Sequence, residues 1–578
     1  MKLTRNLAAA AYGVAAAAAL GTLLSACGDF LKRDPVGVIG GEQLNTPTNV
    51  DGMVVSAYAA LGNDHWITPY TSMWPYGDVR SGDAYKGGGG TGDLNDYNNL
   101  EQFVFTTPTT GVLDQMWFRL YVGVGRANDA LRRLNEMTEA EYPARTTRQA
   151  EVRFIRGHFY FLLKTMYNRV PWIDETLPVT DYERTSNVAL TNDALWQKIA
   201  DDFQFAAANL PATQAQEGRV TKYAALAYLA KVQLYRAYVQ NDQHTVTSVD
   251  QSKLQQVVQL ADSVIGSGKY GLTADFAENF LWETEKNREA VFKINMSLAD
   301  GTPNGRVDMG NGLNYSMAPG YGCCWFHIPS QNLINAFRTD AAGLPQFTTF
   351  NQMSLVDSAD YWTSSVDPRV DHTVGIVSHP FKYDATFVFQ PTWARTPQVY
   401  GTHSSMKELQ HPKCSCLMAV GPFWASSKDI EAIRYADVLL WKAEALIELG
   451  RQNDALPIVN EVRARAASST ARLKYANGTP VSNYNVKPYT AASWTQEYAR
   501  QALRWERRLE FAMEGSRFFD LVRWGVAAQT LNDYFAVEKT RHDYLRNAQF
   551  TAGRDEYLPI PQPQISFTQG LYQQNPGY

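Results

Sequence analysis

The sequence predicts a mainly α-helical protein, a scaffold of tetratricopeptide-like helix pairs with long irregular loop insertions and few short strands. Apolar residues recur at helical spacing through much of residues 112–285 and 428–578. Within 435–466, small residues stand inside one helix, at the turn, and where a second helix crosses the first, as in a tetratricopeptide unit. Glycine, proline and aromatic residues replace this pattern over 62–111 and 289–427. Long loops are therefore expected to interrupt a helical body.

Residues 1–26 are predicted to form a lipoprotein signal peptide. Lys2 and Arg5 supply the positive start, and an apolar, alanine-rich run follows. The run ends in Ser-Ala directly before Cys27, which resembles the bacterial lipobox, where cleavage leaves an acylated cysteine at the new N-terminus. An ordinary secretory signal and a retained membrane anchor are the alternatives. Residues 27–45 would then be a lipidated spacer that holds the protein at a membrane surface.

The body, residues 46–578, is expected to be a single domain. Its helical scaffold begins with 46–61, where valine and alanine recur at helical spacing after candidate N-cap residues. The scaffold continues over 112–285 and returns over 428–578. Between the last two blocks, the run Ala-Val-Phe-Lys-Ile at 290–294 predicts a short strand.

A charged amphipathic stretch near the end of the chain, residues 504–525, predicts a helix pair broken near Gly515. Bulky apolar residues such as Trp505 and Phe519 recur at helical spacing and form one inward-facing stripe. Acidic residues and arginines lie between them, so we interpret the stretch as part of the frame and not as an active site. The expected local ion pairs are Glu506 and Glu510 with Arg507, Glu514 with Arg517, and Asp520 with Arg523.

Composition excludes several classes of function. The net charge is −5 and no basic run is present, so nothing predicts nucleic-acid binding. Four glycines at 87–90 lack the Lys-Ser/Thr step of a phosphate loop, and the nine histidines show no metal-binding spacing. We therefore expect no cofactor and no metal. Aromatic residues reach 12%, with 14 tryptophans and 31 tyrosines, which is the unusual feature of the composition.

Four cysteines remain if Cys27 carries the lipid. They form two close pairs, Cys323 with Cys324 and Cys414 with Cys416. Neighbouring cysteines bridge each other with difficulty, so pairing between the two groups is the favoured expectation, although four cysteines allow three pairings. The two-residue spacers of a zinc site are missing.

The two loop regions carry the residues that could bind a ligand. A pyranose ring has apolar faces and a rim of hydroxyls, so a receptor needs flat aromatic plates with polar groups beside them. Each aromatic could instead pack its loop onto the helices. The predicted plates are Trp66, Trp74, Tyr76, Tyr315, Tyr321 and Trp325, and the predicted rim groups are Asp78, Arg80, Asp83 and Asn98. No catalytic residue is predicted, since a carboxyl pair in a cleft cannot be recognised from sequence.

Several stretches resemble the SusD/RagB family of surface lipoproteins. They are the lipobox with Cys-Gly-Asp-Phe-Leu at 27–31, RGHFYFLLKTMYNRVP at 156–171, IRYADVLLWKAEALIELG at 433–450, residues 506–525, and the tail with Tyr-Leu-Pro-Ile-Pro at 557–561 and Asn-Pro-Gly-Tyr at 575–578. The resemblance implies four tetratricopeptide-like helix pairs, residence at the outer-membrane surface, and a SusC-like TonB-dependent transporter as partner. It also implies that ligand contacts lie in variable loops, here 62–110 and 311–331. The Cys323–Cys324 pair departs from the family pattern.

The expected function is a non-catalytic lipoprotein that binds oligosaccharide or polysaccharide by aromatic stacking and delivers it to that transporter. The stretch 74–88 looks like glycan-targeting members of the family, which favours sugar over peptide. Three alternatives remain open. They are a RagB-like peptide receptor, a surface-tethered glycoside hydrolase or lyase, and a helical-repeat assembly factor without a small ligand.

Overall fold

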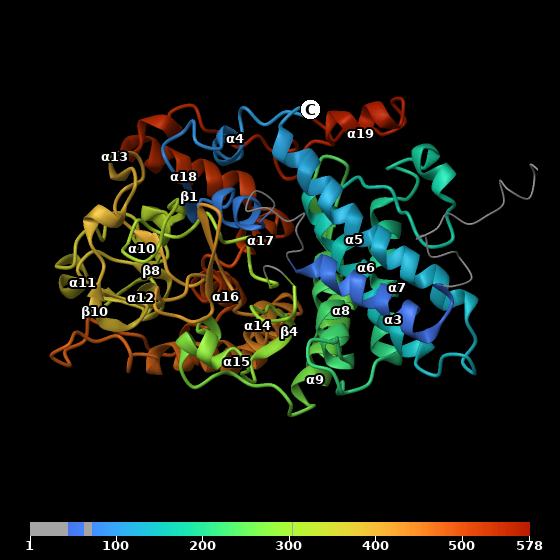
Figure 1. Ribbon diagram of the computed structural model, residues 1–578. Helices are drawn as coiled ribbons and strands as arrows, with labels where there is room; N and C mark the ends of the chain where they lie inside the picture. Colours follow the sequence, from blue (N-terminus) through green and yellow to red (C-terminus); the bar gives the residue numbers. More distant parts are fainter. Residues whose placement is uncertain (1–43, 63–71, 303–304) are drawn as a thin grey trace, which may run out of the picture.

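The computed structural model describes residues 44–62, 72–302 and 305–578 (Figure 1). Its first half is a row of long antiparallel helices, each packed against the next in the chain. The first helix crosses the following two, as Figure 1 shows. These helices are α3 (Pro47–Leu61), α5 (Gly111–Glu136), α6 (Arg145–Tyr167), α7 (Asn192–Asn209), α8 (Lys222–Ala237) and α9 (Gln251–Ile265). The first predicted helical blocks, 46–61 and the early part of 112–285, are confirmed.

The second helical group comes from the end of the chain. Its first helix packs on both α9 and α8, so the two groups share one hydrophobic core. The helix pair predicted over 435–466 is confirmed, with small residues such as Ala443 and Ala455 fully buried where the helices meet. The helices are α14 (Tyr435–Glu448), α15 (Gln452–Ser468), α16 (Gln496–Glu510), α17 (Arg517–Arg523), α18 (Ala527–Arg541) and α19 (Gln562–Phe567).

Small residues on the helices allow neighbouring backbones to approach closely. Gly123 of α5 lies against the ring of Phe159 in α6, and a Cβ atom built on Gly123 would stand 2.3 Å from that ring. Gly125, two residues further along α5, has no such neighbour within 4 Å. The α5–α6 contact therefore depends on glycine at one position and not at the other.

The loop insertions contain short helices and two-stranded sheets. Among the described residues every sheet has two strands, and the predicted strand 290–294 is β4 (Ala290–Ile294), antiparallel to β14 (Ile430–Arg434). The short helices are η2 (Pro75–Val79), α4 (Asn95–Gln102), α10 (Gln331–Ala336), α11 (Asp360–Thr363), α12 (Arg369–Thr373) and α13 (Pro397–Tyr400). The other strands are β1 (Ala84–Gly87), β2 (Tyr238–Gln240), β3 (Val246–Val249), β5 (Phe326–Pro329), β6 (Arg338–Thr339), β7 (Ser365–Val366), β8 (Val374–Gly375), β9 (Pro380–Phe381), β10 (Asp384–Val388), β11 (Ser404–Ser405), β12 (Leu417–Val420) and β13 (Phe423–Ser426).

The charged stretch 504–525 forms α16 and α17, separated by a turn with Gly515 at φ +77°. Of the predicted local ion pairs, the structure contains Asp520 with Arg523, at 2.9 Å. The other local pairings are wrong, because most of these side chains are buried and reach partners in distant elements. Glu506 binds Arg369 and Arg463, Glu510 binds Arg369, Arg434 and Arg465, Glu514 binds Lys407 and Arg434, Arg507 binds Asp520, and Arg517 lies near Asp83.

Glu510 is the centre of this buried ion network. Its side chain is fully buried and accepts hydrogen bonds from Arg369, Arg434 and Arg465. Burial alone would raise the pKa of Glu510, but the three arginines together lower it to about 2. Since Arg434 comes from the end of β14 and Arg369 from α12, the network fixes the loop insertions to the last helices. In the described residues no helix combines the length and apolarity needed to cross a membrane.

Candidate functional site

The two aromatic loop regions, more than two hundred residues apart in the sequence, meet in the structure. Strands β1 and β5 pair antiparallel, with Tyr85 opposite Ile328. Beside this ribbon the indole of Trp74 stacks on the ring of His327, with ring centroids 5.2 Å apart. This contact between the two loop regions could not be predicted from the sequence, because no local pattern indicates that residues 84–87 and 326–329 pair.

Three of the predicted aromatic plates are buried. Trp74 is 4% exposed, and Tyr76 and Trp325 are fully covered. The Tyr76 hydroxyl donates to the carbonyl of Val112 on α5. Trp325 packs against Tyr400 with ring centroids 6.4 Å apart. These side chains hold the loops onto the scaffold, so the expectation that they offer free faces to a ligand is corrected: in this structure no ring face of theirs reaches solvent.

Asp78 joins the two loop regions electrostatically. His327 lies between Asp78 and Glu408, with Nε2 3.0 Å from Oδ2 of Asp78 and Nδ1 2.9 Å from Oε1 of Glu408. The backbone N–H of Gly515 donates to both oxygens of Asp78 at 3.0 Å. Burial alone would lower the pKa of His327, but the two carboxylates raise it to about 9. Asp78 is therefore a buried structural anion, not an exposed rim group.

The remaining predicted rim groups are also buried. Arg80 donates to the carbonyl of Asp555 at 2.6 Å, and its guanidinium lies over the ring of Phe518 at 4.0 Å. Asp83 accepts two hydrogen bonds from Arg508, at 3.0 and 2.8 Å. Asn98 is 6% exposed on α4. Burial lowers the pKa of Arg80 to about 10. These side chains bind the loop to the helices and are out of reach of a surface ligand.

Tyr315 and Tyr321 differ from each other in exposure. Tyr315 is 1% exposed, whereas Tyr321 is partly exposed and donates its hydroxyl to the carbonyl of Gln410. Their rings meet edge to face, with centroids 5.0 Å apart. Trp66 and Cys27 lie outside the described residues. Tyr321 is therefore the predicted plate that the described structure leaves open to solvent.

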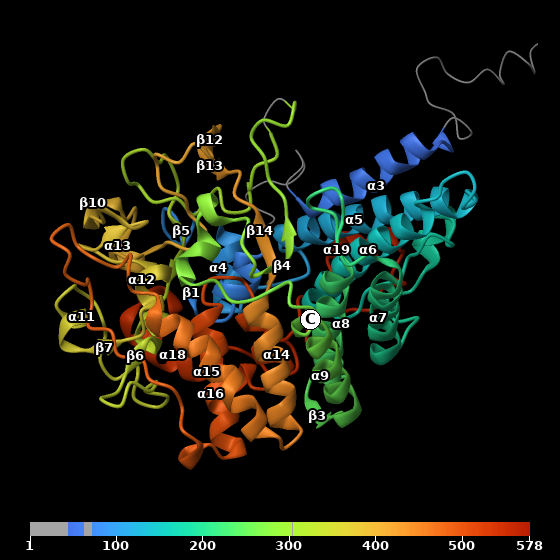
Figure 2. The same ribbon diagram turned by 90° about the horizontal axis from the view of Figure 1, so that it is seen from below.

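The surface around Tyr321 contains aromatic residues that the sequence reasoning did not single out. We call it the loop face and define it by five partly or largely exposed side chains: Met317, Tyr321, Cys323, Phe423 and Trp424. Phe423 and Trp424 follow the turn Gly-Pro at the start of β13, which pairs with β12. Figure 2 shows this hairpin near the upper edge of the molecule and β3 near the lower edge.

Trp424 has the exposure and chemistry expected of a sugar plate. Gly322 lies close to its indole, since a Cβ atom built on Gly322 would stand 3.0 Å from Nε1 of Trp424. Within the described part of the chain that Nε1–H makes no hydrogen bond, and the Trp424 side chain is partly exposed. Phe423 and Trp424 come directly after the Gly-Pro turn and are both partly exposed, so this aromatic dipeptide at a hairpin turn is the sequence signal that could have identified the surface.

The cysteines pair within each group, not between the groups. The structure joins Cys323 to Cys324 and Cys414 to Cys416. The expected cross-pairing is wrong, because the 414–416 loop folds back on itself through the N–H of Cys416, which contacts the sulfur of Cys414 at 3.2 Å. Among the described residues, no three His, Cys, Asp or Glu side chains form a cluster that could hold a metal ion.

Comparisons with known proteins agree over nearly the whole chain. A model of the SusD family matches residues 288–578, and a model described as starch-binding associating with outer membrane matches residues 30–234. The SusD-like protein P2 of Formosa agariphila is 24% identical over 572 residues, 96% of this chain and 97% of its own. A SusD-like protein of Bacteroides ovatus is 28% identical over 280 residues, 47% of each chain.

Solved structures share the fold. A SusD-like protein from Bacteroides fragilis superposes with a TM-score of 0.69 at 20% identity, over 94% of this chain and all of its own. Surface glycan-binding protein A of Bacteroides thetaiotaomicron, solved with laminarihexaose, gives a TM-score of 0.62 at 21% identity, over 92% and 99%. The predicted helical-pair fold is thus confirmed by structures as well as by the helices described above. The chain belongs to the SusD family.

Proposed function

We propose that the protein is a lipid-anchored lipoprotein of the outer-membrane surface that binds oligosaccharide or polysaccharide and passes it to a SusC-like TonB-dependent transporter. Membership of the SusD family supports this role, as does the laminarihexaose bound by the relative from Bacteroides thetaiotaomicron. The observation that carries the proposal is the loop face, where the partly exposed indole of Trp424 lies against Gly322, next in the chain to Tyr321. We therefore assign sugar binding to the loop face and no longer to Trp74 and Trp325, which are buried.

Sugar recognition at such a face follows from its chemistry. The C–H face of a pyranose packs on the indole ring, and a hydroxyl accepts from the indole nitrogen. Polar groups follow Gln410, whose carbonyl accepts from Tyr321. His411 lies 3.3 Å from Asp384, and Lys413 is largely exposed. Each neutral hydrogen bond adds about 0.5 to 1.5 kcal/mol net. Affinity for a polysaccharide would come from several weak contacts, which suits a protein that must release its ligand.

A glycan array probed with the purified full-length protein tests ligand class. We expect binding to one family of polysaccharides, laminarin being one of the probes, and no binding to a matched array of peptides. Binding to peptides alone would replace the proposal with peptide uptake. Reducing ends released from the bound polysaccharide would show that the protein is an enzyme and contradict the non-catalytic role.

The lipid anchor is tested at Cys27. Acylation by long chains contributes about 0.8 kcal/mol per buried methylene, so a protein that carries them should fractionate with membranes. We expect metabolic labelling with palmitate in the wild type and no label in Cys27→Ala, which should leave the membrane fraction. Equal labelling of both proteins would contradict a lipid at this residue.

The transporter is tested by purification. A tagged form of this chain, extracted in mild detergent, is expected to bring down a TonB-dependent β-barrel protein from the native outer membrane. Recovery of the chain without any such protein would contradict the proposed partnership, whatever its glycan affinity.

A further inference from the structure

A cavity lies where the two helical groups meet, away from the loop face. It has a volume of about 390 Å³, within the range of roughly 300 to 1,000 Å³ typical of small-molecule sites. Its walls come from the start of α7, the end of α8, strand β2, the start of α9 and helix α17. In Figure 2 the neighbouring β3 lies near the lower edge of the molecule, whereas β12 and β13 lie near the upper edge. The cavity and the loop face therefore cannot hold the same sugar unit.

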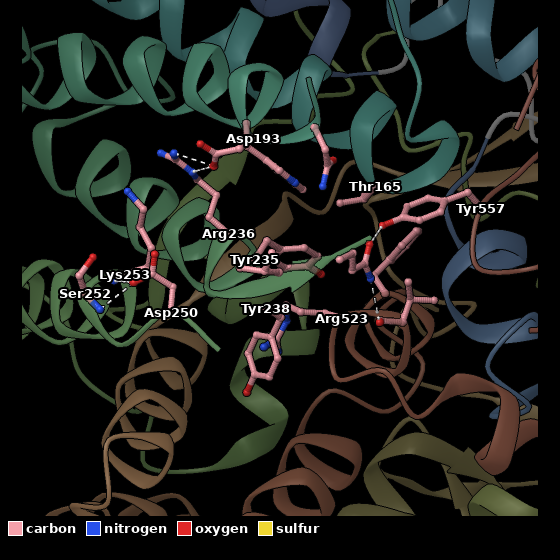
Figure 3. A pocket seen from close by; sticks show the side chains of 16 residues that line it. Thr165, Asp193, Tyr235, Arg236, Tyr238, Asp250, Ser252, Lys253, Arg523 and Tyr557 are labelled. Carbon is pink, nitrogen blue, oxygen red and sulfur yellow. Dashed lines mark hydrogen bonds and ion pairs between the residues drawn. The ribbon is translucent and has the colours of Figure 1, made fainter. Parts of the chain in front are cut away.

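The centre of the cavity is aromatic. Tyr235 is partly exposed, and its ring is supported by Phe161 and Trp196, at centroid distances of 5.0 and 5.9 Å. Figure 3 shows Tyr235 in the middle of the lining residues. The Arg523 guanidinium lies 5.2 Å from the Tyr235 ring, so the ring is fixed on that side. A rigid aromatic ring held in this way loses little conformational entropy when a ligand packs on it.

Polar groups surround the tyrosine on three sides (Figure 3). On one side Oδ1 of Asp193 accepts from Arg236 at 2.9 Å, while Oδ2 has no partner in the described part of the molecule. On a second side Lys253 begins α9, and its Nζ has no partner among the residues described. On the third side the Tyr557 hydroxyl donates to Oε1 of Gln240, whose Nε2 donates to the carbonyl of Val522 at 3.2 Å. The rim thus combines hydrogen-bond acceptors and donors around one ring.

The charges of the lining residues are largely compensated within the protein. Arg236 is paired with Asp193, and Arg523 with Glu444 and Asp520. Asp250 caps α9 by accepting from the N–H groups of Ser252 and Lys253. A strongly charged ligand would find little net opposite charge here, whereas a hydroxyl can both accept from a cation and donate to a carboxylate. The chemistry fits a neutral polyol with an apolar face.

We propose that this cavity is a second carbohydrate site, which takes one or two neutral sugar units stacked on Tyr235 and held by Asp193 and Lys253. The site lies on the helical scaffold and is independent of the loop face. Because residues of both helical groups line it, a bound sugar would contact α7, α8 and α9 on one side and α17 on the other.

The test uses ligand-observed saturation-transfer NMR on the full-length protein with a panel of methyl glycosides of neutral hexoses and pentoses. Val239 lines the cavity and is 42% exposed, so Val239→Trp adds bulk at the mouth without removing core contacts. Lys253→Ala removes one donor from the rim. We expect at least one glycoside to give a signal that falls at least tenfold in Val239→Trp and severalfold in Lys253→Ala, and that persists in Trp424→Ala.

Melting temperatures of both cavity variants within a few degrees of the wild type would show that they fold. The proposal is overturned if no glycoside in the panel gives a signal sensitive to Val239→Trp, or if Trp424→Ala alone abolishes every signal. The second result would assign all sugar binding to the loop face, whereas loss of polysaccharide binding in Trp424→Ala with the glycoside signal retained would support two separate sites.

Discussion

At the scale of single residues, burial decides the role of each aromatic. Trp74 and Trp325 are covered by residues of other loop segments, such as His327 and Tyr400, while Trp424 is partly exposed. The sequence places all three in glycine- and proline-rich stretches, so it cannot separate them. The difference arises from β1 pairing with β5, which draws the segments around Trp74 and Trp325 together and covers both rings. The sequence near either strand contains no pattern that indicates such long-range pairing.

His327 makes a pH-dependent contribution to stability. Its pKa is about 9 in the folded protein because Glu408 and Asp78 outweigh burial, against about 6.5 in an unfolded chain. Folding therefore takes up a proton between these values, and the stabilisation is complete below about pH 6.5 and lost as the pH rises through about 9. The shift corresponds to about 3 kcal/mol.

The measurement is the free energy of unfolding of wild type and His327→Gln between pH 6 and pH 10. We expect the difference in free energy of unfolding between the wild type and His327→Gln to decrease progressively as the pH rises across that range. A difference between the two proteins that stays constant with pH would mean that His327 does not hold an extra proton in the folded state.

At the scale of elements, the contact between α5 and α6 depends on one glycine. Gly123→Ala should destabilise the protein, because the added Cβ would stand 2.3 Å from the Phe159 ring and force the helices apart. Gly125→Ala in the same helix should stabilise it by about 0.5 to 1 kcal/mol, since the site is open and alanine favours helix. Thermal unfolding of the two variants checks this, and equal shifts of the same sign would contradict the packing described.

The ion network at Glu510 joins elements that are far apart in sequence. Glu510→Ala should cost about 3 to 5 kcal/mol, because Arg369, Arg434 and Arg465 would lose a shared buried partner. Asp129→Ala is the matched control: it breaks the exposed pair with Arg132, where the aspartate side chain is 60% exposed, and should cost less than about 1 kcal/mol. Denaturant titration measures the free energy of unfolding of Glu510→Ala, Asp129→Ala and the wild type. Similar costs for both would show that the network adds no more than a surface pair.

The helical elements were predictable to a greater degree than their ion pairs. Helical periodicity is a local property, so α3, the helix pair α14–α15 and the break at Gly515 follow from sequence. The local pairs expected for Glu506 and Glu510 were wrong because burial brings distant arginines closer than the sequence neighbour. The predicted pairing between the two cysteine groups was wrong for a related reason. It followed from the sequence spacing of Cys323 and Cys324, whereas the pairs depend on how each loop folds.

At the scale of the whole molecule, two helical groups carry loop insertions whose outermost part is the loop face. Both groups share one core, and the insertions are tied to it by β4 with β14 and by the Glu510 network. The stretch 504–525 therefore holds the loop insertions in place, through buried ion pairs such as Glu510 with Arg434 and Arg508 with Asp83. Family membership could be inferred from sequence because scaffold residues carry it, whereas the loop face could be recognised only from the structure.

The central claim is that the loop face binds glycan through Trp424. Isothermal titration of the best polysaccharide from the glycan array into wild type, Trp424→Ala and Trp362→Ala tests it most directly. Trp362 lies on α11 and is 46% exposed, so it is a matched surface tryptophan away from the loop face. We expect Trp424→Ala to weaken binding at least tenfold, about 1.4 kcal/mol, and Trp362→Ala to leave it unchanged. Unchanged affinity in Trp424→Ala would contradict the assignment of the site.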